Sequence, residues 1–281
     1  MPYDWFPTFL LFGPTGSGKT RFASNFLRYK KPDGSGPLKI EVADIGHGLT
    51  SSVAEVNQDL CFPINTFTDL VAYAAGIEER NSDVIVIDDL SFLNFKLAIE
   101  SAQIRGPTKD TEPDVLNLLQ SKKYTNIRFK PPEIRDRGIA SEKLRILIYN
   151  LLDMKKIVVF TCGEALEAEK INRTLGDEPI FTGRTYREPN LPGKLASELP
   201  YFVNEVFYFY VDGGADGVVH KIRTQPDGSW IKDCKDRSDR VRLIKGWRNG
   251  VVQNDREGKL FDAMIGALPW PNGCKPVLQQ S

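Results

Sequence analysis

The sequence has few of the residues that build disulfide frameworks and zinc sites. Among its 281 residues are four cysteines and two histidines. The cysteines are far apart and form no C-x-x-C pair: Cys61, Cys162, Cys234 and Cys274. This spacing indicates reduced thiols in a cytosol-like compartment. With only His47 and His220 to add to the cysteines, we expect no zinc site.

Long apolar runs and a net charge are also absent. No run approaches the ~20 apolar residues that a membrane-spanning helix needs. The first predicted strand comes too early to leave room for a signal peptide. Lys+Arg and Asp+Glu number 37 each, so a nucleic-acid partner would need local basic patches. We therefore expect a soluble, cytoplasmic protein whose hydrophobic fraction of 41% is enough for a sizeable core.

The strongest motif is Gly13-Pro14-Thr15-Gly16-Ser17-Gly18-Lys19-Thr20, which matches the phosphate-binding P-loop G-x-x-x-x-G-K-[ST]. An apolar run over 5–12 predicts the strand that enters it, and residues 18–29 have helical spacing. The glycines let successive N–H groups turn toward phosphate oxygens, and the helix adds its first N–H groups. Lys19 would place a charge at the β- and γ-phosphates, and Thr20 a hydroxyl at Mg²⁺. The alternative, a glycine-rich turn that binds nothing, is disfavoured by the flanking strand and helix.

Strands and helices alternate after this motif. We predict strands over 38–43, 83–89 and 156–162, and a helix over 69–79. Four consecutive aliphatic residues, Val84 to Ile87, indicate a strand that is buried on both faces of a parallel sheet. The chain is therefore predicted to be an α/β protein with a doubly wound, mainly parallel sheet. Its ligand would lie at the carboxyl ends of the strands.

Two aspartates end the strand over 83–89. In a P-loop protein, an aspartate in this place accepts hydrogen bonds from water bound to Mg²⁺. We therefore predict that Asp88 serves the metal together with Thr20. Asp89 beside it either polarises the attacking water or caps the next segment.

A basic stretch from Lys122 to Arg137 is predicted to be irregular, and a helical pattern follows over Leu144–Leu152. Tyr124 and Phe129 lie among its cations. Such a mixture suits a single nucleic-acid strand, because cations bind phosphates while rings stack on bases. The candidate contacts are Lys122, Lys123, Arg128 and Lys130. The alternative is a solvated surface loop.

The second half of the chain begins with a long polar connection over 163–195, which includes Arg184 and Arg187. Connections of this length are usually functional or disordered. An antiparallel meander is predicted next, with strands over 206–211, 217–223 and 229–232 and turns at 212–214 and 226–228. We assign one domain to 1–248 and a tail to 249–281, with one possible helix over 255–265.

The order of these parts resembles the RecA-like recombinase core, and more closely the phage-encoded RecA-superfamily ATPases of single-strand annealing. The resemblance covers roughly residues 8–240. Besides the P-loop it is carried by Asp44–Leu49, Val84–Asp88, the strand that ends at Cys162, Leu191–Lys194 before Val206–Val211, and Lys235–Arg237. It implies a RecA-like fold, Mg²⁺ and ATP as cofactors, and homo-oligomeric rings or filaments in the host cytoplasm. It also implies single-stranded DNA held by loops within 100–140 and 165–195, with a single-strand-binding protein as a possible partner.

A second cation at the nucleotide is expected from a neighbouring subunit. The P-loop has one lysine of its own, and charge on a transferring phosphoryl group is stabilised by a further cation supplied in trans. By the resemblance, Lys235 and Arg237 would take this role. The alternative is that they pair with Asp233, Asp236 and Asp239 on a solvated turn.

Gly46 departs from the family pattern, which usually has a glutamate there to activate water. Glycine cannot act as a base, so hydrolysis would depend on Asp89 or Glu164. The leading hypothesis is an ATP-dependent single-stranded DNA-binding protein of phage-type recombination or annealing, with weak or DNA-stimulated ATPase activity. A helicase-like motor or packaging ATPase, a structural switch with little turnover, and a small-molecule kinase remain open.

Overall fold

The computed structural model describes residues 6–46, 61–105, 132–175, 178–214, 217–227, 231, 234–236, 241–253, 258–268, 270 and 275–279. Its first half contains β1 (Thr8–Phe12), α1 (Lys19–Ser24), η1 (Asn25–Arg28), β2 (Tyr29–Lys30), β3 (Ile40–Asp44), β4 (Cys61–Pro63), α2 (Phe67–Ala75), α3 (Ile77–Arg80), β5 (Val84–Asp88) and α4 (Leu90–Arg105). Its second half contains α6 (Ile134–Leu152), β6 (Ile157–Cys162), β7 (Glu164–Leu175), β8 (Glu178–Pro189), α7 (Leu195–Phe202), β9 (Glu205–Gly214), β10 (Gly217–Arg223), β11 (Lys235–Asp236), η4 (Val241–Leu243), β12 (Val251–Gln253), α8 (Lys259–Ala267) and β13 (Val277–Leu278).

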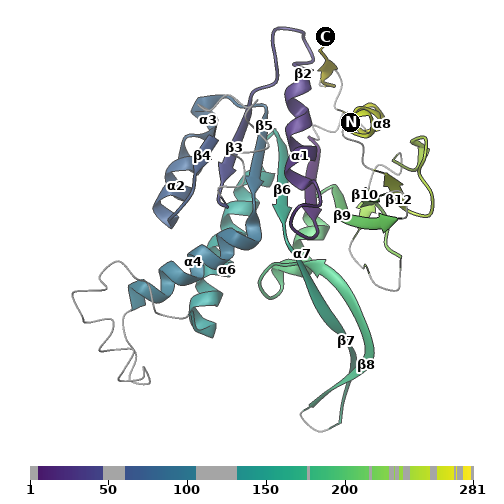
Figure 1. Cartoon of the computed structure of the whole chain (residues 1–281). Helices are drawn as coiled ribbons and strands as arrows, with labels where there is room; N and C mark the ends of the chain where they lie inside the picture. Colours follow the sequence, from purple (N-terminus) through teal and green to yellow (C-terminus); the bar gives the residue numbers. More distant parts are fainter. Residues whose placement is uncertain are drawn as a thin grey trace, which may run out of the picture.

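A nine-stranded sheet forms the centre of the fold (Figure 1). Its strand order is β12-β10-β9-β1-β6-β5-β3-β4, and β11 pairs with β9. From β9 to β4 every neighbouring pair is parallel, whereas β10, β11 and β12 are antiparallel additions. The predicted α/β class, with a mainly parallel sheet and antiparallel strands toward the C-terminus, is confirmed.

Helices cover both faces of this sheet, because the central strands are apolar on both sides. In β1, Leu10 and Phe12 belong to one core, and Phe9 and Leu11 belong to the other. Helices α2, α3, α4, α6 and α7 pack on the first core, and α1, η1 and α8 pack on the second. This two-sided burial is the reason why the sheet is doubly wound. Among the described residues, no helix is long and apolar enough to cross a membrane.

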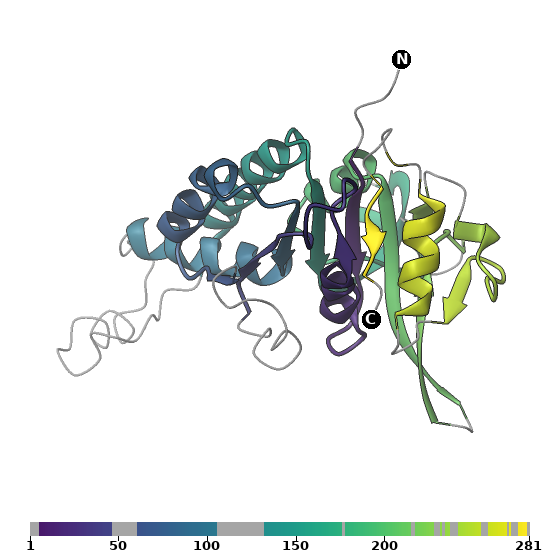
Figure 2. The ribbon, with the colours of Figure 1, turned by 90° about the horizontal axis from the view of Figure 1, so that it is seen from above.

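The C-terminal elements pack against the first helix. The ring of Phe261 on α8 lies 4.9 Å from that of Phe22 and 4.8 Å from that of Phe26, both edge-on. The Arg28 guanidinium pairs with Asp262 at 2.7 Å, and β13 adds to β2. In Figure 2 these yellow elements lie beside the purple N-terminal ones. The predicted helix over 255–265 is found as α8; the division of the chain after residue 248 stays a prediction.

The segment over 163–195, which we predicted to be a long polar connection, is largely regular in structure. Its greater part is an antiparallel hairpin of β7 and β8, which projects from the body of the molecule (Figure 1). The sequence of the hairpin does not alternate regularly between apolar and polar residues, so this signal of a strand with one buried face did not predict it. The strand predicted over 229–232 falls mostly outside the described residues, although Ile231 bridges to Arg187.

Helix α6 also begins earlier than predicted. Ile134 is its first residue, so the last residues of the stretch from Lys122 to Arg137 are helical rather than irregular. Glu133 and Asp136 form a capping box there, in which each side chain accepts a backbone N–H of the other residue. Since Ile134 is 90% exposed, this first turn carries no apolar signal.

Candidate nucleotide site

The P-loop connects β1 to α1 and has the backbone that its glycines permit. Gly13, Gly16 and Gly18 have φ angles of 144°, 76° and 101°, which residues with a Cβ rarely adopt. A Cβ atom on Gly13 would lie 2.0 Å from the carbonyl oxygen of Phe209 on β9. Glycine is therefore required at Gly13 both for conformation and for the close approach of β9.

Lys19, the first residue of α1, folds its amine back onto the loop. Its Nζ donates to the carbonyl oxygens of Gly13 at 2.8 Å and Pro14 at 2.9 Å. Burial lowers the pKa of Lys19, and the acidic groups of the site, Cys162, Asp89, Asp88 and Glu164, oppose that shift. A cation held within a loop of positive-φ glycines fits a bound phosphate group.

Thr20 and Asp88 are brought together, as the sequence predicts for a metal site. The Thr20 hydroxyl donates to Asp88 Oδ2 at 2.8 Å. Thr161 on β6 donates to the other carboxylate oxygen, Oδ1. A hydroxyl and a carboxylate beside a phosphate loop are oxygen ligands of the kind that Mg²⁺ prefers, so these residues fit that ion. Thr161 was missed, although a hydroxyl after the apolar residues of a buried strand could have indicated it.

Asp89 makes the contact of a helix cap. Its Oδ1 accepts the backbone N–H of Phe92 at 2.7 Å, in the first turn of α4. Burial is the main cause that raises the pKa of the Asp89 carboxyl. Of the two roles that the sequence left open, the capping contact is present.

Glu164, the first residue of β7, is held from two sides. One carboxylate oxygen accepts the Tyr208 hydroxyl at 2.7 Å, and the other pairs with Arg187 of β8. Burial, and then the contact with Glu164, raise the pKa of Tyr208. Glu164 therefore fastens the base of the hairpin to β9.

Gly46 follows β3. Among the described residues, no atom lies within 4 Å of a Cβ atom built on Gly46. Asp44, at the end of β3, is buried and lies in register with Asp88 on β5. Asp44 was missed as a site residue, although an acidic residue that ends a predicted strand was a usable signal.

The remaining predicted residues are more dispersed. In the sheet, Lys235 on β11 lies opposite Val206 on β9. Val206 comes before Phe209, the residue of β9 that approaches Gly13 of the P-loop. Arg184 is exposed on β8, and Arg187 contacts Glu164 as described above. Those that lie outside the described residues are Arg237, Lys122, Lys123, Arg128 and Lys130. The structure thus brings together the P-loop, Asp88, Asp89 and Glu164.

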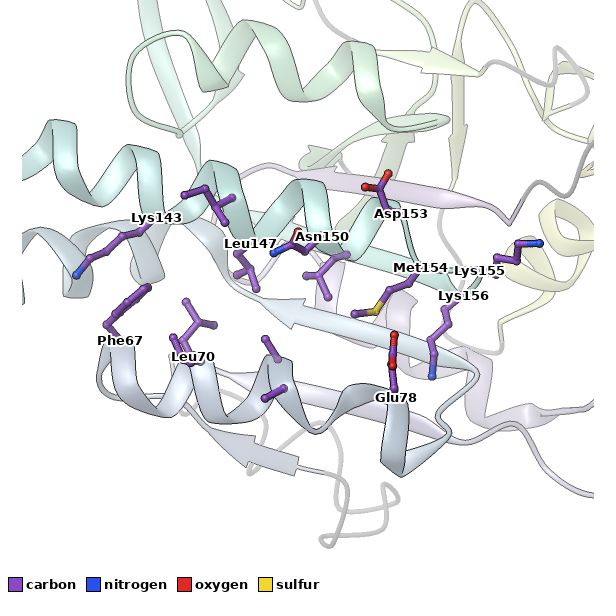
Figure 3. A pocket seen from close by; sticks show the side chains of 15 residues that line it. Phe67, Leu70, Glu78, Lys143, Leu147, Asn150, Asp153, Met154, Lys155 and Lys156 are labelled. Atoms are coloured by element: carbon purple, nitrogen blue, oxygen red, sulfur yellow. The ribbon is translucent and has the colours of Figure 1, made fainter.

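A cavity of about 750 Å³ lies apart from this site, between α2 and α6 (Figure 3). Apolar side chains such as Leu70 and Leu147 line its middle, with Lys143 toward one end and Glu78 toward the other. None of its lining residues belongs to the predicted site, so the cavity is not the nucleotide site.

No protein-family model and no curated protein matches the chain. Among solved structures, a KaiC-like protein from the hyperthermophilic archaeon Pyrococcus horikoshii is 14% identical over 89% of each chain, with a TM-score of 0.44. The flagellar accessory protein FlaH from Methanocaldococcus jannaschii is 13% identical, covers 79% of this chain and 78% of its own, and has a TM-score of 0.36. The fold assignment rests on the strand order and the P-loop described above.

Proposed function

We propose that this chain is a RecA-like P-loop ATPase that binds Mg²⁺ and ATP. The observation that carries the proposal is the hydrogen bond between Thr20 and Asp88, beside a glycine loop that holds Lys19. The loop N–H groups and Lys19 would bind the phosphates, and Thr20 and Asp88 would hold the metal. The ion supplies positive charge to the phosphate oxygens when it is bound. The parallel strands that carry these residues end at one edge of the sheet, where α/β proteins bind ligands.

The finer assignment is single-stranded DNA binding in recombination or annealing of the phage type. Two features support it. The sequence from Lys122 interleaves cations with aromatic rings. The β7–β8 hairpin, with Arg184 exposed on it, extends from the edge of the sheet that carries the nucleotide site (Figure 1). Assembly into a ring or filament, with Lys235 and Arg237 facing the neighbour's ATP, belongs to the same proposal.

An ATP-dependent switch with little hydrolysis is the second candidate, and a specific set of contacts favours it. Gly46 offers no side chain, Asp89 caps α4, and both oxygens of Glu164 have partners. Of the three positions considered for a general base, one has no carboxylate, one uses a carboxylate oxygen to cap a helix, and one has both oxygens engaged. Binding of ATP requires no such base and is unaffected.

ATP turnover measured with and without single-stranded DNA separates these functions. The control is Lys19→Ala, which removes the charge at the triphosphate and should weaken Mg-ATP binding at least about tenfold, or ~1.4 kcal/mol. Turnover stimulated by DNA supports the DNA-dependent ATPase. Tight binding with negligible turnover in both conditions supports the switch.

DNA binding is measured in parallel as a function of salt. Contacts to phosphates make the logarithm of the affinity fall linearly with the logarithm of the salt concentration. If the wild type and Lys19→Ala bind Mg-ATP equally, the P-loop assignment is wrong. If DNA neither binds nor changes turnover, the recombination assignment fails, while the ATPase assignment stands.

A further inference from the structure

His220 on β10 lies against the back of the P-loop. Strand β10 pairs with β9 in register, with His220 opposite Val211. Strand β9 in turn brings the carbonyl of Phe209 to Gly13, so the β9–β10 pair flanks the loop. One of only two histidines in the chain is therefore placed beside the phosphate-binding motif.

The contact is made to the backbone of the loop. Nδ1 of His220 lies 3.2 Å from the carbonyl oxygen of Ser17. A carbonyl only accepts hydrogen bonds, so this contact requires the proton on Nδ1. Ser17 is fully buried, and a buried carbonyl without a partner is unfavourable. His220 supplies that partner.

The geometry of the peptide bond transmits this contact to the other side of the loop. In a planar trans peptide, the C=O of Ser17 and the N–H of Gly18 point in opposite directions. Fixing the carbonyl toward His220 thus turns the Gly18 N–H away from β10. Gly18 has a φ of 101°, in a region where glycine has little intrinsic preference to hold one orientation. An external hydrogen bond is therefore an effective way to fix this peptide.

We infer that His220 is a positioning residue of the nucleotide site, which orients the Ser17–Gly18 peptide so that its N–H faces a phosphate oxygen. The inference rests on the proposed function, in which this loop binds ATP. His220 acts through the backbone and need not touch the nucleotide. Its side chain thus determines how well the loop is organised before the ligand arrives.

Substitutions at His220 test this role by isothermal titration with Mg-ATP. His220→Leu removes the donor and should weaken binding roughly five- to tenfold, because the loop carbonyl loses its partner. His220→Asn places an amide N–H near the position of Nδ1 and should restore affinity to within about twofold of the wild type. His220→Gln extends its amide beyond that position and should not. Val218→Ala is the matched control, because Val218 lies on the same side of β10 and is 70% exposed.

Two further readouts separate positioning from simple folding. Melting temperatures without nucleotide show whether each variant is folded; if His220→Leu is not, the comparison of Asn with Gln decides. In the free wild type, ¹⁵N NMR should show the Nδ1–H tautomer of His220. The inference is overturned if His220→Leu binds Mg-ATP as tightly as the wild type, or if the tautomer is Nε2–H. It is also overturned if His220→Asn binds Mg-ATP as weakly as His220→Gln. A wild type that binds no Mg-ATP overturns the proposed function and this inference together, whereas unchanged affinity in His220→Leu overturns this inference alone.

Discussion

If the chain is the slow ATPase proposed above, replacing Gly46 by glutamate should make its ATP turnover faster. Gly46 directly follows Ile45, whose N–H donates to the carbonyl of Asp88 at 2.8 Å, so the new side chain starts close to the proposed metal ligand. Among the residues that the structure describes, no atom lies within 4 Å of a Cβ atom built there, and Gly46 is not among the residues with positive φ. A general base contributes roughly 10²–10⁴-fold to a reaction rate. The lower bound corresponds to ~2.7 kcal/mol of transition-state stabilisation.

A newly introduced carboxylate is less well oriented than a native general base, so the expected gain lies below that range, at least about tenfold in turnover. Phosphate release at saturating Mg-ATP measures it. Gly46→Gln is the control, because it has the same size and polarity but no basic carboxylate. If Glu and Gln behave alike, or if the wild type already hydrolyses ATP briskly and Asp89→Ala does not slow it, then the base lies elsewhere and the reasoning from Gly46 is refuted.

Two further predictions concern stability. Phe261→Ala should lower the free energy of unfolding by about 3–5 kcal/mol, because the ring packs edge-on against three others; denaturant unfolding measures this, with the exposed Ala263→Ser as a control expected within ~0.5 kcal/mol of the wild type. Burial raises the pKa of Asp89 above its ordinary value of 3.8, so the folded state binds more protons than the unfolded one, and stability falls as pH rises through the raised pKa. Asp89→Asn keeps a capping oxygen without this titration. Its melting temperature relative to the wild type should therefore be higher at about pH 7 than at about pH 4, and equal differences at both would contradict the burial argument.

The sequence predicted those elements whose pattern is imposed by burial. Strand β5 was predicted from four aliphatic residues, because a strand covered on both faces has no room for polar side chains. The P-loop was predicted because phosphate binding restricts the residue types at each position. Its contact with Asp88 followed from the rule that ligands bind at the carboxyl ends of parallel strands.

Elements without a buried face, and contacts between distant residues, could not be predicted in this way. The β7–β8 hairpin projects from the core, so no apolar stripe records it. The first turn of α6 depends on a capping box among charged residues, which resembles a polar loop in composition. Glu164 has two partners, Arg187 on β8 and Tyr208 on β9. These residues are distant in the sequence, and only the three-dimensional arrangement brings them together.

The packing of α8 on α1 has a consequence for how the protein is made. Arg28 and Asp262, which join these segments, are 234 residues apart in the chain. While the nascent chain is still being synthesised, the rings of Phe22 and Phe26 have no α8 to cover them, because Phe261 has not yet been added. Contacts over such sequence separations form late, and apolar surface exposed in the interval is prone to aggregation. The helix that begins at the P-loop lysine is thus among the first to be translated and among the last to reach its final surroundings, and a chain stalled before α8 would present a surface that chaperones bind.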